Sequence, residues 1–200
     1  MGLKLDYPAG ATPLDPEDAR ALVPSHITTQ GQLNEWEFLN VREGEQWAWG
    51  RKHANILSIE FIRTLHKRMF GDTWRWAGEI RTKETHPVGA PPENVRAELE
   101  TLFKDVAVQL KDGGWSIGEI AARFHHRLVS IHPFPNGNGR FSRTMTDLLL
   151  IRKGSNRFAW GADLDRDGEA RTRYIASLRA ADAKDYRPLF DLLGLPEKGK

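Results

Sequence analysis

The sequence contains no cysteine, which excludes disulfide bonds and thiolate metal sites. It has no apolar run of the length that a membrane span requires, and its first residues lack the apolar segment of a signal peptide. No internal repeat or low-complexity tract is present. We therefore expect a cytoplasmic protein with no membrane contact.

The chain also has little excess charge of either sign. Its 29 lysine and arginine residues nearly balance its 27 aspartate and glutamate residues, for a formal net charge of +2. Such a balance gives no general attraction to nucleic acid, so we expect no nucleic-acid partner. The length of 200 residues, of which 40% are hydrophobic, suits one globular unit with a sizeable core.

Amphipathic segments and helix caps recur along the chain and predict an all-α fold. The clearest start is the capping box of Ser116 and Glu119. Helices are expected at 15–23, from Thr28 or Thr29 to about 49, and at 59–70, 92–112, 117–131, 140–151, 168–182 and 186–193. We interpret residues 1–54 as an N-terminal arm with regulatory helices, packed in one unit with a main domain at residues 55–200.

Helical periodicity fails between Trp76 and Pro91. Residues 78–83 suit a short strand, and the following Pro87, Gly89 and Pro91 leave room only for a turn and a brief return. The sequence therefore predicts one small β-hairpin flap on the helical bundle.

The segment 131–143 has an unusual composition for a connection between two helices. Gly137 and Gly139 flank Asn138 just ahead of a helix, so successive backbone N–H groups can turn inward and form a nest for anions. The positive end of the following helix adds to this attraction. Arg140 and Arg143 project from one side of that helix. Two guanidinium groups beside such a nest indicate a ligand with more than one phosphate.

His132 precedes this nest by five residues. A neutral imidazole there can take a proton from an incoming hydroxyl. Phe134 lies between two prolines and is expected to be a buried anchor, and Asn136 offers an oxygen to a metal ion. A base, an anion nest and cationic side chains together suit the attack of a hydroxyl on a nucleotide phosphate.

This segment resembles the Fic motif, His-x-Phe-x-acid-Gly-Asn-Gly-Arg-x-x-Arg. The matching positions are His132, Phe134, Gly137, Asn138, Gly139, Arg140 and Arg143. Residues 74–81 resemble the lead-in to the flap of the Fic/DOC family, and residues 174–182 resemble its C-terminal helix. The resemblance covers residues 55–195, and the run 33–37 is similar to a bacterial subgroup named mobile mystery protein B.

The resemblance implies a Fic-type helical bundle that transfers AMP from ATP to a protein. By this resemblance His132 deprotonates a Tyr, Ser or Thr hydroxyl of the target, which then attacks the α-phosphate. Residues 137–139 would hold the α- and β-phosphates, Arg140 and Arg143 the β- and γ-phosphates, and Mg²⁺ or Mn²⁺ would accompany the nucleotide. Such an enzyme can serve as a toxin that is held in check.

The resemblance also implies a docking mode for the target protein. The flap residues Ile80, Arg81, Thr82 and Lys83 would hold the target chain by strand addition, which depends on backbone hydrogen bonds more than on sequence.

Two departures from the family pattern matter. Asn136 stands where the family commonly has an acid that helps to hold magnesium, and an uncharged amide oxygen is a weaker ligand. In addition, no window fits the family's inhibitory helix, whose glutamate pairs with the second motif arginine. The candidates for this glutamate are Glu35, Glu37 and Glu43, and a separate antitoxin chain is the alternative.

Two other functions compete with AMP transfer. The first is a catalytically weak module that binds nucleotide and regulates a partner, with Asn136 as its sign. The second is the transfer of another phosphate-linked group, such as UMP or phosphate, because the motif reads phosphates and not the base.

Overall fold

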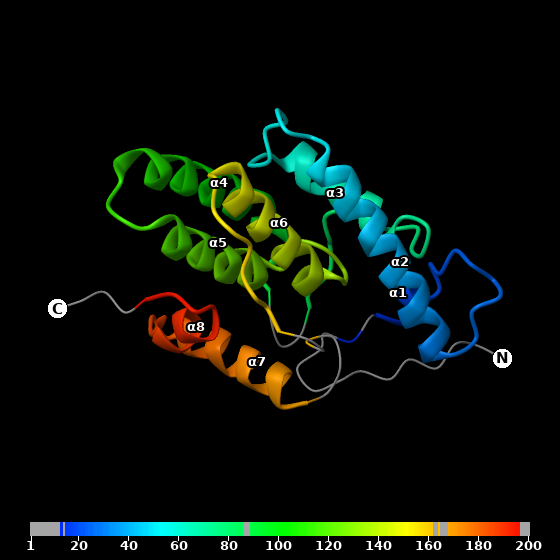
Figure 1. Ribbon diagram of the computed structural model, residues 1–200. Coiled ribbons are helices and arrows are strands. Elements are labelled where there is room, and N and C mark those ends of the chain that lie inside the picture. The colour runs from blue at the N-terminus through cyan, green and yellow to red at the C-terminus, as the bar shows by residue number, and fades with distance from the viewer. Residues whose placement is uncertain (1–12, 14, 86–88, 162–163, 165–167, 197–200) are drawn as a thin grey trace.

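The computed structural model describes residues 13, 15–85, 89–161, 164 and 168–196. This part of the chain is helical, and no strand occurs in it beyond an isolated bridge between Leu22 and Trp74 (Figure 1). The elements are α1 (Pro16–Ala19), α2 (Gln30–Trp49), α3 (Ile59–Phe70), the 3-10 turn η1 (Pro92–Asn94), α4 (Val95–Asp112), α5 (Ile117–Ile131), α6 (Asn138–Arg152), α7 (Glu169–Asp182) and α8 (Arg187–Leu192).

The helices start where the caps in the sequence place them. The side chain of Thr29 caps α2, and the capping box of Ser116 and Glu119 opens α5. The start of α6 differs from the prediction by two residues. It begins at Asn138 and not at Arg140, because Gly137 adopts the left-handed conformation (φ 76°) and turns the chain directly into the helix.

The main core lies between α2, α3, α4, α5 and α6. Fully buried aromatic rings fill its centre, among them Phe70, Phe124 and Phe141. Helix α2 packs along α3 (Figure 1). Gly44 permits this close approach, since a Cβ atom there would lie only 2.7 Å from the backbone nitrogen of Met69. The N-terminal helix α2 is thus built into the same core as the motif helices.

Helices α7 and α8 pack against each other, and α8 also contacts α5 through a small apolar cluster. A polar contact joins α7 to α5 as well, because His126 Nε2 lies 2.8 Å from Asp182 Oδ1. The hydroxyl of Tyr186 meets the other ring nitrogen of His126 at 3.1 Å. The C-terminal helices are therefore held beside the helix that leads into the motif loop.

The predicted β-hairpin is not seen in the described residues, and that prediction is wrong for residues 79–85 and 89–90; its turn, with Pro87, lies outside them. The reason is that backbone N–H groups of this segment donate to carbonyls in another part of the chain. The N–H of Arg81 donates to the carbonyl of Pro133 (3.0 Å), and the N–H of Ala90 donates to the carbonyl of Ile131 (3.2 Å). The backbone N–H groups of Arg81 and Ala90 therefore bond to the end of α5 and the start of the motif loop.

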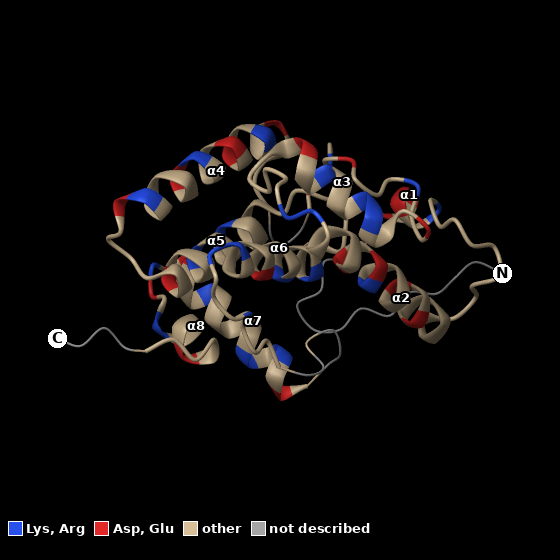
Figure 2. Cartoon of the chain, turned by 45° about the horizontal axis from the view of Figure 1, so that its top comes forward, with Lys and Arg blue, Asp and Glu red and all other residues tan. Residues whose placement is uncertain are grey.

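Basic and acidic residues are interspersed along the helices and form no stripe of one sign among the residues drawn (Figure 2). Within the described part of the chain, no helix combines the length and the apolar character needed to cross a membrane.

Candidate active site

His132 closes α5 in a strained conformation. Its backbone is left-handed (φ 54°, ψ 63°), which is costly for a residue with a side chain. The side chain is 7% exposed, and neither ring nitrogen has a hydrogen-bond partner among the described residues. Burial, followed by the positive charge of Arg81, lowers the pKa of His132 to about 4. The imidazole is therefore neutral at neutral pH, with lone-pair capacity that the fold leaves unused.

The loop after His132 is closed by Asn138. Its side-chain oxygen accepts the N–H of Phe134 (3.0 Å), and its side-chain nitrogen donates to the carbonyl of the same residue (2.7 Å). The ring of Phe134 is fully buried, as the sequence predicted, and it packs edge-on against Phe141. The amide of Asn138 is thus occupied in the fold, so this residue can contribute to an anion site through its backbone.

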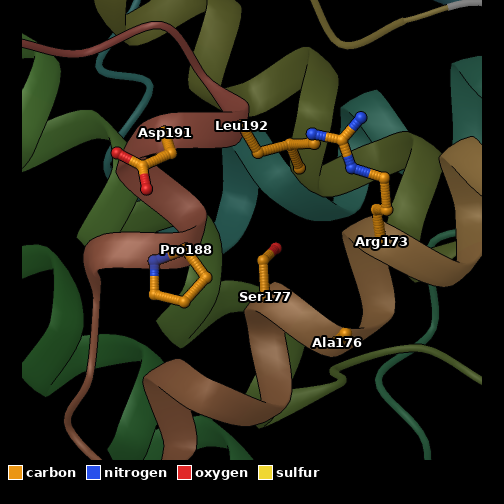
Figure 3. Close-up of a pocket in the computed structure, with 6 residues that line it drawn as sticks. All are labelled: Arg173, Ala176, Ser177, Pro188, Asp191 and Leu192. Carbon is orange, nitrogen blue, oxygen red and sulfur yellow. The ribbon is translucent and has the colours of Figure 1, made fainter.

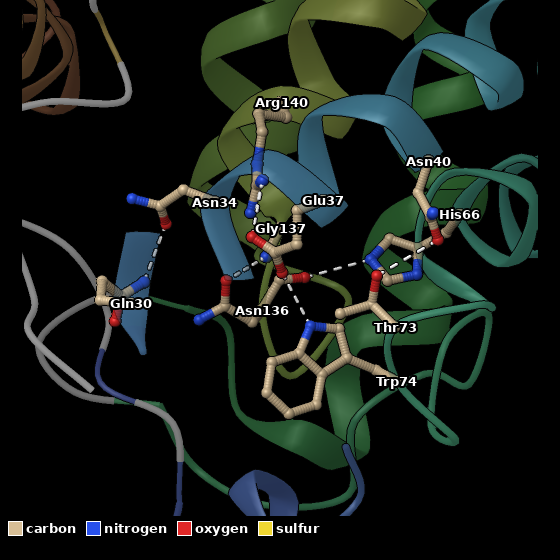
Figure 4. Close-up of polar contacts among 10 residues, drawn as sticks. All are labelled: Gln30, Asn34, Glu37, Asn40, His66, Thr73, Trp74, Asn136, Gly137 and Arg140. Atoms are coloured by element: carbon tan, nitrogen blue, oxygen red, sulfur yellow. Dashed lines mark hydrogen bonds and ion pairs between the residues drawn. The ribbon is translucent and has the colours of Figure 1, made fainter. Parts of the chain in front are cut away.

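His66 supports the loop from α3, a role that the sequence did not reveal. The N–H of Gly78 donates to His66 Nδ1 (3.0 Å), so the proton lies on Nε2 and is donated to the carbonyl of Asn136 at 3.1 Å (Figure 4). Its ring stacks on Phe134 with 3.8 Å between centroids. Burial lowers the pKa of His66 to about 3, so it stays neutral. The sequence signal for this role was the position of His66 within the apolar face of the helix expected at residues 59–70.

The turn into α6 is where the sequence predicts an anion cradle. Gly137 packs so closely that a Cβ atom there would lie 2.6 Å from the ring of Phe70. At Gly139 a Cβ atom would make only an ordinary contact, with a guanidinium nitrogen of Arg143 at 3.7 Å. The first turn of α6 contains no acidic residue. A phosphate can therefore approach the backbone at Gly139 and meet Arg143 at the positive end of the helix.

Arg140, the other motif arginine, is paired with Glu37 of α2. Arg140 NH1 donates to Glu37 Oε2 at 2.9 Å, and Glu37 Oε1 accepts the indole N–H of Trp74 at 2.7 Å (Figure 4). Glu37 is buried, whereas Glu35 and Glu43 are exposed on the same helix. Of the three candidate glutamates, the structure places Glu37 at the motif. Its ion pair is with Arg140, the first motif arginine, whereas the resemblance implied the second, Arg143.

The described residues offer little for a metal ion. Asn136 directs its side-chain oxygen to the N–H of Gly137 (2.6 Å). In the same part of the chain no group of three His, Asp or Glu residues could hold a metal. The protein would supply one neutral amide oxygen, so Mg²⁺ would be held mainly by nucleotide phosphates and water.

Two surface hollows lie apart from the motif residues. One, of about 360 Å³, lies between α7 and α8 (Figure 3). Its lining is Arg173, Ala176, Ser177, Pro188, Asp191 and Leu192. The other, of about 490 Å³, lies along α3 beside the lead-in at residues 75–79. Neither includes a residue of the segment 131–143, so the candidate site rests on the motif geometry.

The fold and the site together define a helical domain with a neutral histidine ahead of a glycine-rich turn. Residues 56–150 match the family model described as the Fic/DOC family. Residues 56–150 therefore form a domain of the Fic/DOC family.

Relatives and solved structures agree with this assignment. The chain is 33% identical to protein adenylyltransferase fic-1 of Caenorhabditis elegans over 68% of its length, but spans only 26% of that relative. It is 28% identical to the probable protein adenylyltransferase y4lH of Sinorhizobium fredii, covering 82% of this chain and 84% of that one.

Two solved structures illustrate the fold. The structure of C. elegans Fic-1 superposes with a TM-score of 0.62 at 29% identity, covering 78% of this chain and 48% of that chain. An ADP-bound N-terminal Fic domain from Bartonella quintana has a TM-score of 0.66 at 21% identity, with coverages of 84% and 86%.

Proposed function

We propose that this protein is an adenylyltransferase that transfers AMP from ATP to a hydroxyl of a target protein. The observation that carries the proposal is the buried, neutral and unpartnered ring of His132 ahead of the anion cradle of α6. The names of the relatives, protein adenylyltransferase fic-1 and y4lH, support the same activity. The ADP bound to the Bartonella domain supports a nucleotide as the ligand.

In the proposed reaction, ATP lies with its phosphates on the first turn of α6. Gly139 leaves room for the phosphates to reach the backbone, and Arg143 offsets their charge. His132 removes the proton of a Tyr, Ser or Thr hydroxyl of the target. The hydroxyl oxygen forms a bond to the α-phosphorus, the bond from that phosphorus to the bridging oxygen breaks, and pyrophosphate leaves. Mg²⁺ or Mn²⁺ would neutralise part of the phosphate charge.

We further propose that the enzyme restrains itself through its N-terminal segment. Glu37 forms an ion pair with the Arg140 guanidinium, the group that the resemblance assigns to the nucleotide phosphates. This assigns a regulatory role to residues 1–54 and the catalytic role to residues 55–200. A separate antitoxin is not required by this arrangement.

The target chain is proposed to add along the outer edge of the flap arm. The N–H of Arg81 points inward to Pro133, so in an extended segment Ile80 and Thr82 present their backbone groups to the other side. Thr82 and Lys83 are also exposed, which leaves this edge open to a partner.

The test is incubation with ATP labelled on the α-phosphate, Mg²⁺ or Mn²⁺ and bacterial lysate. We expect labelled protein with the wild type and none with His132→Ala, whereas the exposed His53→Ala serves as the matched control and should retain labelling. Label from γ-labelled ATP would indicate phosphate transfer, and better labelling from UTP would indicate UMP transfer. ATP binding without any transfer would favour the nucleotide-binding module, which the neutral Asn136 and the occupied Arg140 also suit.

A further inference from the structure

Arg81 is a buried arginine whose hydrogen-bond partners are backbone carbonyls. Its side chain is 4% exposed. The Nε–H donates to the carbonyl of His132 at 2.6 Å, and NH1 donates to that of Lys83 at 2.8 Å. The remaining nitrogen, NH2, donates to the carbonyls of Ala90 and Ile131. One guanidinium therefore joins both flap arms to the end of α5.

The carbonyls of Ile131 and His132 lie where α5 ends and His132 turns left-handed. The last carbonyls of a helix have no partner within it, and the helix dipole makes this end negative. A buried guanidinium presents several N–H groups in a fixed plane, which suits several carbonyls at once. The position of Arg81 thus satisfies the polar groups that the strained turn at His132 leaves open.

We propose that Arg81 is a positioning residue, which holds the backbone of His132 in the left-handed turn and thereby places the imidazole for proton removal. The effect on proton removal rests on the proposed function, whereas the effect of Arg81 on the backbone of His132 does not. It replaces the docking role that the sequence suggested for Arg81. By contrast, the neighbouring Lys83 is exposed and pairs with Asp15 and Glu17 on the surface.

The charge of Arg81 acts in the same direction as its hydrogen bonds. It is the second cause, after burial, of the lowered pKa of His132. A positive group beside the carbonyl of His132 disfavours the imidazolium and keeps the ring available as a base at neutral pH. Arg81 therefore contributes to both the place and the protonation state of the proposed base.

The test compares Arg81→Met and Arg81→Lys with Arg63→Met. Arg63 is the matched control because its Nε–H donates to the carbonyl of Gly78 (2.9 Å) in the same lead-in, and no hydrogen bond joins its side chain to residues 131–133 in the described structure. Three quantities are measured: the ¹³Cα and ¹³Cβ chemical shifts of His132, which report its left-handed backbone, the affinity for ATP, and the rate of AMP transfer at saturating ATP.

We expect Arg81→Met to lose the left-handed shifts of His132 and to lower the rate by about 100-fold, since a displacement of about 1 Å has such an effect. The affinity for ATP should change by less than about threefold, because no hydrogen bond of Arg81 goes to residues 137–143. Arg81→Lys retains the charge but not the planar fork and should show the same displacement. Arg63→Met should resemble the wild type in all three.

Left-handed shifts and a rate near that of the wild type in either Arg81 variant would overturn the inference. If both variants fail to fold, hydrogen exchange in the wild type provides the test. We expect the Nε–H proton of Arg81 to exchange slowly. Exchange as fast as that of the exposed Arg75 would contradict the positioning role of Arg81. If the wild type transfers no AMP, the proposed function fails, whereas the shifts of His132 still test the role of Arg81.

Discussion

Glu37 and Arg140 lie 103 positions apart in the chain and share a 2.9 Å ion pair at the motif loop. The pair is mostly shielded from solvent, since the side chains are 11% and 22% exposed. Glu37 also accepts a hydrogen bond from the indole of Trp74, which fixes the carboxylate in place. The N-terminal helix and the proposed phosphate site are therefore linked through one side chain.

The first prediction is that Glu37→Gln increases ATP affinity and AMP transfer. Glutamine retains an oxygen for the indole of Trp74 but removes the charge that occupies Arg140. A hydrogen bond between charged groups contributes about 1.5–3 kcal/mol, so an increase of about 10- to 100-fold is expected. Calorimetric ATP titration and labelling from α-labelled ATP measure it.

The exposed Glu35→Gln on the same helix is the control and should leave both values unchanged. If Glu37→Gln binds ATP no more tightly than the wild type, the pair does not restrain the site.

The second prediction concerns the two glycines of the anion cradle. Gly137→Ala should destabilise the fold by more than about 1 kcal/mol, because its φ is positive and the new Cβ atom would meet the ring of Phe70. Gly139→Ala should leave stability nearly unchanged but weaken ATP binding, because its Cβ atom would fill the space that a phosphate needs. Urea unfolding and ATP titration separate the two effects, and equal stability losses in both variants would contradict this division.

The third prediction is that Asn136→Asp strengthens the binding of Mg²⁺ at the proposed nucleotide site. A carboxylate is a stronger ligand for this ion than an amide oxygen. The aspartate oxygen can still accept the N–H of Gly137. Transfer rates measured over a Mg²⁺ titration should reach half their maximum at a lower concentration than in the wild type, and an unchanged midpoint would show that this side chain is not a ligand.

The fourth prediction is a loss of stability in mild acid. Burial holds the pKa of His66 and His125 at about 3 and that of His132 at about 4, all below the unfolded value of 6.5. The unfolded chain therefore binds more protons below pH 6.5, and stability that is complete above that pH is lost as the pH falls towards 4. Each histidine contributes about 1.4 kcal/mol per pH unit in this window.

Urea unfolding at pH 7.5 and pH 5.5 measures this effect, which amounts to about 4 kcal/mol for three histidines. Asp147 opposes it in part, because burial raises the pKa of that carboxyl to about 6. His125→Gln should reduce the pH dependence by about a third. A free energy of unfolding that stays constant or rises in acid would contradict the assignment of these histidines as buried and neutral.

Local sequence signals were sufficient for the helices and for the motif loop. Caps such as Thr29 and Ser116 act within one turn of the chain, and the turn at Gly137 that opens α6 depends on neighbouring residues. These features are therefore visible before the fold is known.

Contacts between residues that lie far apart in the sequence could not be predicted in the same way. The choice of Glu37 over Glu35 and Glu43 depends on which face of α2 packs against α3, and the role of His66 depends on where Gly78 and Asn136 meet it. The missing hairpin has the same origin, because the sequence showed a turn but not that the arms would bond to Ile131 and Pro133.

The inward bonding of the flap arms also limits how such a protein can diverge. The donors at Arg81 and Ala90 must stay in register with acceptors in another part of the chain. An inserted or deleted residue directly beside Arg81 or Ala90 would shift this register and break these bonds, whereas substitution of the exposed Thr82 or Glu84 would break none of them. New binding specificities should thus arise by point substitution on the outer edge of the flap, while the length of its arms is conserved.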